Sequence, residues 1–141
     1  MDYAIIAAGE GSRLVEEGVT TPKPLVRLLG EPMIDRLMGL FLRHGATSIS
    51  VIVNEEMLEV REHMTDLELP IPLNLMVRST PSSLHSFHAL KPFLTGNACC
   101  LTTVDTVFSE AAFEIYLDTF LRTPSVDGRD RIRGRREAAL C

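Results

Sequence analysis

Several absences narrow the kind of protein that this chain can be. No apolar run approaches the roughly 18–20 residues that a membrane-spanning helix needs. The first residues lack the basic region and small-residue cleavage site of an export signal. There are three cysteines, Cys99, Cys100 and Cys141, an odd number with two adjacent, which does not form a disulfide framework. We therefore expect a cytoplasmic protein that has no membrane segment and whose strand cysteines are buried, inert thiols.

A basic excess is also absent. The net charge is −5, and residues 1–121 carry eight Lys or Arg against sixteen Asp or Glu. Residues 122–141 differ, with six Arg against three acids. The acidic body argues against a nucleic-acid-binding protein, which usually presents a basic face. A phosphate ligand is still compatible with it, because a few local cations or a carboxylate-held divalent ion suffice.

The hydrophobic pattern indicates one α/β domain with a mostly parallel sheet. Continuous apolar or β-branched runs predict strands over residues 2–8, 48–53, 73–77 and 98–104. Apolar spacing and capping residues predict helices between them, over residues 30–45, 55–64, 79–94 and 109–121. Leu25–Leu29 could be a short strand or the edge of a loop. Alternation of strands and helices is typical of layered α/β folds.

Each helix has predicted inward anchors. In the first, these are Ile34, Leu37, Met38, Phe41 and Leu42. In the second, they are Met57, Val60 and Met64. In the third, the predicted anchors are Leu84, Phe87 and Phe93. The fourth helix begins at Ser109, and its predicted inward residues are Phe113, Leu117, Phe120 and Leu121. After Pro124 the apolar pattern stops. We interpret residues 124–141 as a basic, disordered tail, with a small nucleic-acid arm as the alternative.

The stretch from Gly9 to Pro24 carries most of the functional signal. A buried strand runs into Gly9-Glu10-Gly11-Ser12-Arg13, and Lys23 follows between Pro22 and Pro24. A strand entering a glycine-rich, cation-bearing loop brings backbone close to a phosphate. A nucleoside-triphosphatase P-loop is excluded, because no Gly-x-x-x-x-Gly-Lys-Ser/Thr string is present. A dinucleotide fingerprint stays open but fits poorly, since Leu14 stands at its third glycine position.

The same stretch resembles a known family. AAGEGSRL, then TPKPL, then GEPMID is similar to the start of the sugar-phosphate nucleotidyltransferases and their molybdopterin-cofactor relatives. LTTVDTVF resembles that family's strand ending in a metal-binding aspartate, here Asp105. The resemblance covers about residues 2–122. The matching positions are Ala7, Ala8, Gly9, Gly11, Ser12, Arg13, Leu14, Pro22, Lys23, Pro24 and Leu25.

The resemblance implies a Rossmann-like fold and a nucleotidyltransferase. In such enzymes a phosphorylated acceptor, most often a sugar phosphate, attacks the α-phosphorus of a nucleoside triphosphate and pyrophosphate leaves. It implies Arg13 and Lys23 as catalytic cations, which could contact the phosphates, and Asp105 as the holder of Mg²⁺. The implied nucleotide-binding residues are Ala7, Ala8, Gly9, Gly11 and Ser12, with Thr80, Ser82 and Ser83 near the base; Ser82 and Ser83 could equally be helix caps.

The chain also departs from the family pattern. Family domains continue for roughly another hundred residues, which carry a second metal-binding acid and the acceptor-binding residues. We therefore expect residues 1–123 to be the nucleotide-binding part of a domain truncated at its C-terminal side, by a shortened or frameshifted reading frame. The alternative function is a non-catalytic nucleotide-binding or interaction module. The loss of the last strands would expose an edge of the sheet, and such an edge favours self-association.

Overall fold

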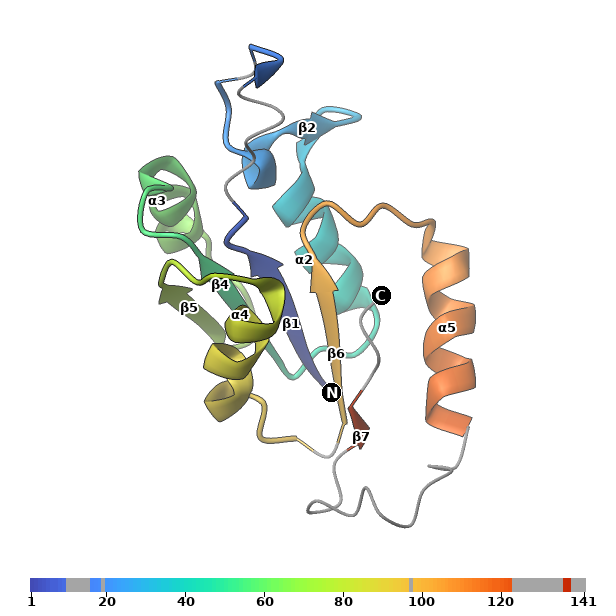
Figure 1. Cartoon of the computed structure of the whole chain (residues 1–141). Helices are drawn as coiled ribbons and strands as arrows, with labels where there is room; N and C mark the ends of the chain where they lie inside the picture. Colours follow the sequence, from blue (N-terminus) through green and yellow to red (C-terminus); the bar gives the residue numbers. More distant parts are fainter. Residues whose placement is uncertain (10–15, 19, 97, 123–135, 138–141) are drawn as a thin grey trace.

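The computed structural model describes residues 1–9, 16–18, 20–96, 98–122 and 136–137. Its centre is a parallel sheet of β1 (Asp2–Ala7), β4 (Ser48–Val53), β5 (Leu73–Val77) and β6 (Ala98–Thr103), in the order β5-β4-β1-β6 (Figure 1). The two-residue β7 (Arg136–Glu137) pairs in parallel with the start of β6. The predicted α/β fold with a mostly parallel sheet is thus confirmed.

Helices cover both faces of the sheet (Figure 1). On one face, α2 (Met33–Arg43), α3 (Leu58–Asp66) and α5 (Glu110–Arg122) share a buried apolar cluster with alternate residues of the strands. On the other face, α4 (Ser83–Leu90) and the 3₁₀ turn η2 (Lys91–Phe93) pack on the remaining strand residues. Because β1 is buried on both faces, it is a continuous apolar run in the sequence, as parallel strands usually are.

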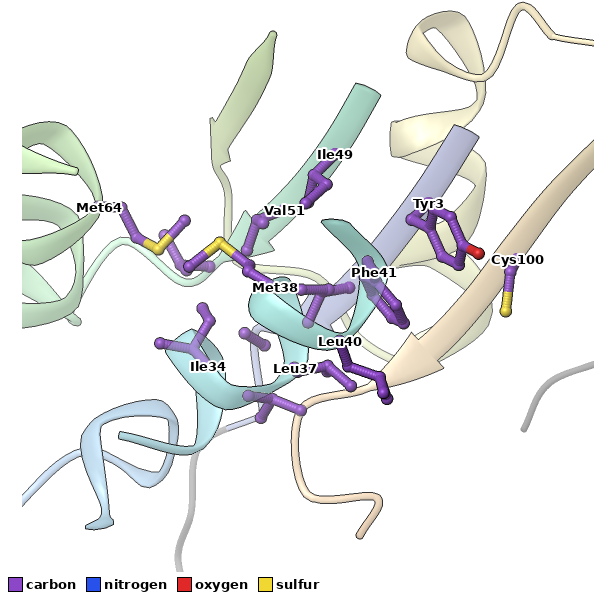
Figure 2. Close-up of a cluster of buried hydrophobic side chains, with 14 of the residues drawn as sticks. Tyr3, Ile34, Leu37, Met38, Leu40, Phe41, Ile49, Val51, Met64 and Cys100 are labelled. Carbon is purple, nitrogen blue, oxygen red and sulfur yellow. The ribbon is translucent and has the colours of Figure 1, made fainter. Parts of the chain in front are cut away.

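The larger apolar cluster is centred on α2. Figure 2 shows Phe41 of α2 close to Tyr3 of β1; the two rings stack with centroids 4.2 Å apart. Phe113 of α5 lies on the same pair, 5.7 Å from Phe41. The hydroxyl of Tyr3 donates to the carbonyl of His44 at 2.8 Å, and burial raises the pKa of that phenol well above its usual value. The aromatic contacts fix where α2 and α5 lie against the sheet.

Two of the predicted helix anchors are wrong. Leu84 is 70% exposed, because the first turn of α4 faces solvent and the inward positions are Ser86, Phe87 and Leu90. Leu121 is 51% exposed, while Phe113 and Leu117 of the same helix are buried. Helix α4 also ends at Leu90 rather than near Leu94, since Pro92 cannot donate the next helical hydrogen bond.

The segment before α2 is more regular than its sequence indicates. The 3₁₀ turn η1 (Lys23–Leu25) is followed by β2 (Arg27–Leu28) and β3 (Glu31–Pro32), which pair antiparallel. Gly30 between these strands has a φ of +84°, which favours glycine. Helix α2 starts at Met33, with Pro32 as an extended N-cap residue and not a member of the first turn. Similarly, α3 starts at Leu58, later than Glu55.

The described part of the chain contains no helix long and apolar enough to cross a membrane. Cys99 and Cys100 lie buried in β6, as predicted. Cytoplasmic location stays a prediction. Of the predicted tail 124–141, only Arg136–Glu137 lies within the described residues, so its disorder and the domain boundary at residue 123 stay predictions as well.

Asp2 forms hydrogen bonds with residues at the amino ends of the neighbouring strands. Its carboxylate, 6% exposed, accepts from the backbone N–H of Gly96 at 2.6 Å and from the hydroxyls of Ser48 and Thr47 at 2.9 and 3.4 Å. A buried carboxylate is stable only when donors of this kind surround it. Sequence periodicity did not reveal this role, because one acid before an apolar run gives no pattern.

Gly96→Ala should therefore destabilise the protein. A Cβ at this position would lie 2.9 Å from Oδ2 of Asp2, which cannot move without losing its other donors. We expect a loss of about 1–3 kcal/mol in the free energy of unfolding, measured by urea denaturation. Gly39→Ala in α2 is the matched control, since its Cβ would meet only the end of the Arg43 side chain at 3.4 Å. It should gain about 0.5–1 kcal/mol; equal losses in both variants would refute this role of Asp2.

Candidate functional site

Those predicted site residues that the structure describes follow the carboxyl ends of the strands or, in the case of Lys23, reach that edge from a separate turn. Strand β1 has β4 on one side and β6 on the other, so the order of strands along the chain reverses beside β1. In open α/β sheets, ligands bind in the crevice outside such a reversal. The N–H of Val104 donates to the carbonyl of Ile6 at 3.0 Å, which continues the β1–β6 pairing beyond β6. Asp105 therefore comes from the strand adjacent to the one that leads into Gly9.

Lys23 reaches this edge from a turn that is anchored independently. The N–H groups of Leu25 and Val26 donate to the carbonyls of Pro22 and Lys23 at 2.9 and 3.1 Å. Pro24 is buried, and Leu25 packs against the larger apolar cluster. Because two prolines restrict φ on either side of Lys23, the turn presents its side chain from a restricted backbone.

Lys23 and Asp105 form an ion pair across 82 residues of sequence. The distance between Nζ of Lys23 and Oδ2 of Asp105 is 3.0 Å, and the side chains are 33% and 48% exposed. The Thr103 hydroxyl, and after it the Lys23 ammonium, hold the pKa of the Asp105 carboxyl below its usual value. The structure thus brings a predicted catalytic cation and the predicted metal-binding acid together, with the carboxylate ionised at neutral pH.

Gly9 is the exposed residue that follows the end of β1. Ala7 and Ala8 before it are buried. Among the described residues, a Cβ built on Gly9 would meet nothing within 4 Å, and its φ is not in the left-handed region. Close approach of a ligand is one physical reason for a glycine at such a position. Gly11, Ser12 and Arg13 lie outside the described residues.

Asn54 is a member of this edge that sequence reasoning missed. It is 6% exposed, at the end of β4, and its Nδ2 donates to the carbonyl of Ala8 at 3.5 Å. Its Oδ1 accepts from the N–H of Glu56 at 3.0 Å. The side chain therefore bridges the ends of β1 and β4 directly before Gly9. A buried asparagine after an apolar strand was the available signal, because its amide needs partners there.

Thr80, Ser82 and Ser83 lie between β5 and α4. Ser82 is the N-cap of α4; its Oγ accepts from the N–H of His85 at 3.5 Å and lies 2.8 Å from Nδ1 of the same residue. Thr80 shares a hydrogen bond with Ser86, with 2.5 Å between the hydroxyl oxygens. Ser83 is the exposed first residue of the helix. Ser82 therefore has the alternative capping role, and nucleobase contact by this segment stays a prediction.

Metal-binding groups are sparse around Asp105. Within the described residues, no group of three or more His, Cys, Asp or Glu side chains could hold a metal ion. A surface hollow of about 450 Å³ exists elsewhere, lined by Leu58, Arg61, Glu62, Thr65 and Asp66 of α3. It contains none of the predicted site residues. Asp105, which follows β6, is the carboxylate that the sequence predicts as the metal ligand.

Comparison with known proteins identifies a matching family. Residues 3–127 match the family described as MobA-like NTP transferase domain. The chain belongs to this family. The match spans the glycine-rich segment, the Lys23 turn and Asp105, so the resemblance carried by those motifs is confirmed.

Curated relatives are longer than this chain. It is 31% identical over 110 residues to a 2-aminoethylphosphonate cytidylyltransferase of Lancefieldella rimae, covering 75% of the chain and 43% of that protein. It is 29% identical over 83 residues to a glucose-1-phosphate cytidylyltransferase of Salmonella typhimurium, covering 54% and 32%. The chain thus spans less than half of the length of either relative.

A solved structure shares the fold. The inositol-1-phosphate CTP transferase of T. maritima superposes with a TM-score of 0.68 at 19% identity, over 80% of this chain and 46% of that one. At this identity the likeness concerns the fold alone, and it agrees with the predicted Rossmann-like arrangement.

Proposed function

We propose that this chain carries the nucleotide-binding part of a nucleotidyltransferase that uses CTP. The observation that carries the proposal is the 3.0 Å pair of Lys23 and Asp105, at the edge of the sheet where β1 leads into Gly9. A triphosphate needs cations and backbone N–H groups at one point; Lys23 would supply a cation and the backbone that follows β1 would supply the N–H groups. The relatives named as cytidylyltransferases favour cytosine as the base.

In the proposed reaction, a phosphate or phosphonate oxygen of the acceptor attacks the α-phosphorus of CTP. The bond from the α-phosphorus to the bridging oxygen breaks, and pyrophosphate leaves. No covalent bond to the protein forms, so the chain's residues act by positioning and by neutralising charge. Arg13 and Lys23 would bind phosphate oxygens, and the backbone at Ala7, Ala8, Gly9, Gly11 and Ser12 would hold the nucleotide. Thr80, Ser82 and Ser83 would contact the base.

Asp105 would hold Mg²⁺. The donor set fits, because the carboxylate is ionised and half exposed, and Mg²⁺ binds through one or two carboxylates together with phosphate oxygens. When bound, the ion would neutralise charge on the triphosphate. The acceptor remains a class: the relatives named above act on 2-aminoethylphosphonate and on glucose 1-phosphate, so we propose a small molecule bearing a phosphate or phosphonate group.

A second candidate is a module that binds nucleotide without transferring it. It is favoured by the lack, among the described residues, of any cluster of three metal-binding side chains around Asp105. Such a module would share the nucleotide contacts of the first candidate and differ only in turnover.

Pyrophosphate release separates the candidates. The protein is incubated with Mg²⁺, one of the four nucleoside triphosphates, and 2-aminoethylphosphonate, glucose 1-phosphate or inositol 1-phosphate. We expect release to need Mg²⁺, to be fastest with CTP and to stop on addition of EDTA. Binding of CTP without release would favour the second candidate, and absence of nucleotide binding would refute both.

A further inference from the structure

Lys23 and Asp105, two charged residues of the candidate site, are paired with each other. Under the proposed function, Lys23 serves the phosphates and Asp105 serves the metal. In the structure, the Lys23 ammonium lies 3.0 Å from Oδ2 of Asp105. A divalent ion bound to the same carboxylate would stand close to that ammonium, and like charges at such distances repel strongly. The observed pair and the metal-bound arrangement therefore compete for Asp105.

The pair is not required to hold the fold together. Its two members are carried by segments that have their own anchors, the buried Pro24 on one side and the Val104–Ile6 hydrogen bond on the other. Partly exposed ion pairs of this kind add little to stability. The contact can therefore open without unfolding either segment.

We propose that Lys23 and Asp105 exchange partners when the nucleotide binds. In the nucleotide-free protein each neutralises the other; on entry of a metal-bound triphosphate, Lys23 moves to phosphate oxygens and Asp105 to the metal. The inference rests on the proposed function and describes how Lys23 and Asp105 are paired before the nucleotide binds.

Partner exchange makes metal and nucleotide bind together. Metal alone must displace Lys23 without offering it a new partner, and metal-free nucleotide must draw Lys23 away and leave Asp105 unpaired. Only the combination gives both groups a partner. Each ligand should then raise the affinity for the other by the same factor, which for coupled sites is typically about 5–150-fold.

The lysine content of the chain allows a direct test. Lys23 and Lys91 are its only lysines. Protein labelled with ¹³Cε-lysine should show two side-chain signals, and Lys23→Arg assigns them by removing one. Asp105→Asn should shift the Lys23 signal in the nucleotide-free protein and leave that of Lys91, exposed in η2, in place. Mg²⁺ with CTP should shift the Lys23 signal, whereas Mg²⁺ alone should not.

Metal binding gives a second readout that is independent of activity. Mn²⁺ alone, followed by electron paramagnetic resonance, should bind Lys23→Met at least about fivefold more tightly than the wild type. Lys91→Met removes the other lysine and should bind Mn²⁺ as the wild type does. In Lys23→Met, CTP should no longer gain affinity from Mn²⁺ by the factor seen in the wild type.

The outcomes distinguish this inference from the proposed function. If Mg²⁺ with CTP binds and pyrophosphate is released while the Lys23 signal stays unchanged, partner exchange is refuted and the proposed function stands. Equal Mn²⁺ affinity of the wild type and Lys23→Met also refutes the exchange. If Mg²⁺ with CTP does not bind the wild type at all, the proposed function fails and the exchange fails with it.

Discussion

Asp105→Asn is expected to lower the rate of pyrophosphate release by about 10²–10³-fold, the loss typical of removing one group that stabilises charge in the transition state. Asparagine keeps the size of the side chain but removes the negative charge that a hard cation and the Lys23 ammonium need. The rate is measured at saturating CTP and acceptor, so that a weaker nucleotide affinity does not account for the loss.

The fold should tolerate this change. The Asp105 side chain is 48% exposed, and exposed ion pairs contribute about 0–1 kcal/mol to stability. The urea midpoint of Asp105→Asn should therefore stay close to that of the wild type. Asp118→Asn is the matched control, because Asp118 pairs with Arg122 on the exposed side of α5, away from the strand ends. A comparable loss of activity in both variants would refute a role of Asp105 in the site.

The strands and α2 could be predicted from the sequence because their burial leaves a pattern. A strand covered on both faces, such as β1 after Asp2, is an almost continuous apolar run, and α2 shows its buried face at helical spacing. The hairpin of β2 and β3 could not be predicted in the same way. Its strands have two residues each, too few for any alternation to appear.

The residues of the site could likewise be predicted only in part. Lys23 and Asp105 were assigned from motifs in the sequence, whereas their contact depends on the strand order, which no local pattern records. Asn54 in the site was missed, as was Asp2 at the opposite, amino edge of the sheet, because a single polar residue next to an apolar run resembles a turn residue. The wrong anchors Leu84 and Leu121 have the opposite cause: apolar residues also occur on exposed helix faces.

The reversal of the strand order beside β1 explains how residues that are distant in the sequence come together at one edge of the sheet. The loop after β1 and the turn after β6 leave adjacent strands at the same edge, so residues distant in sequence meet there without a special connection. Asn54 links the end of β4 to the same edge by its hydrogen bond to the carbonyl of Ala8. The precision of the site therefore depends on the sheet, and the sheet depends on the apolar cluster that α2 makes with β1.

Phe41→Ala should accordingly be the most damaging single substitution in the core. Phe41 is fully buried, stacked on Tyr3 at 4.2 Å and 5.7 Å from Phe113, so its removal leaves a cavity between β1, α2 and α5. Phenylalanine-to-alanine changes at such positions cost about 3–5 kcal/mol. Since domains of this kind are stable by about 5–15 kcal/mol, the variant should unfold at a much lower urea concentration than the wild type.

The matched control for Phe41→Ala is Ile115→Ala on α5, whose side chain is 68% exposed and should change stability by no more than about 0.5 kcal/mol. CTP binding adds a second criterion. If Phe41 acts only through the fold, the folded fraction of Phe41→Ala at low temperature should bind CTP with wild-type affinity, because Lys23 and Asp105 are unchanged. Weak binding by protein that is still folded would show that Phe41 also fixes the geometry of the strand ends.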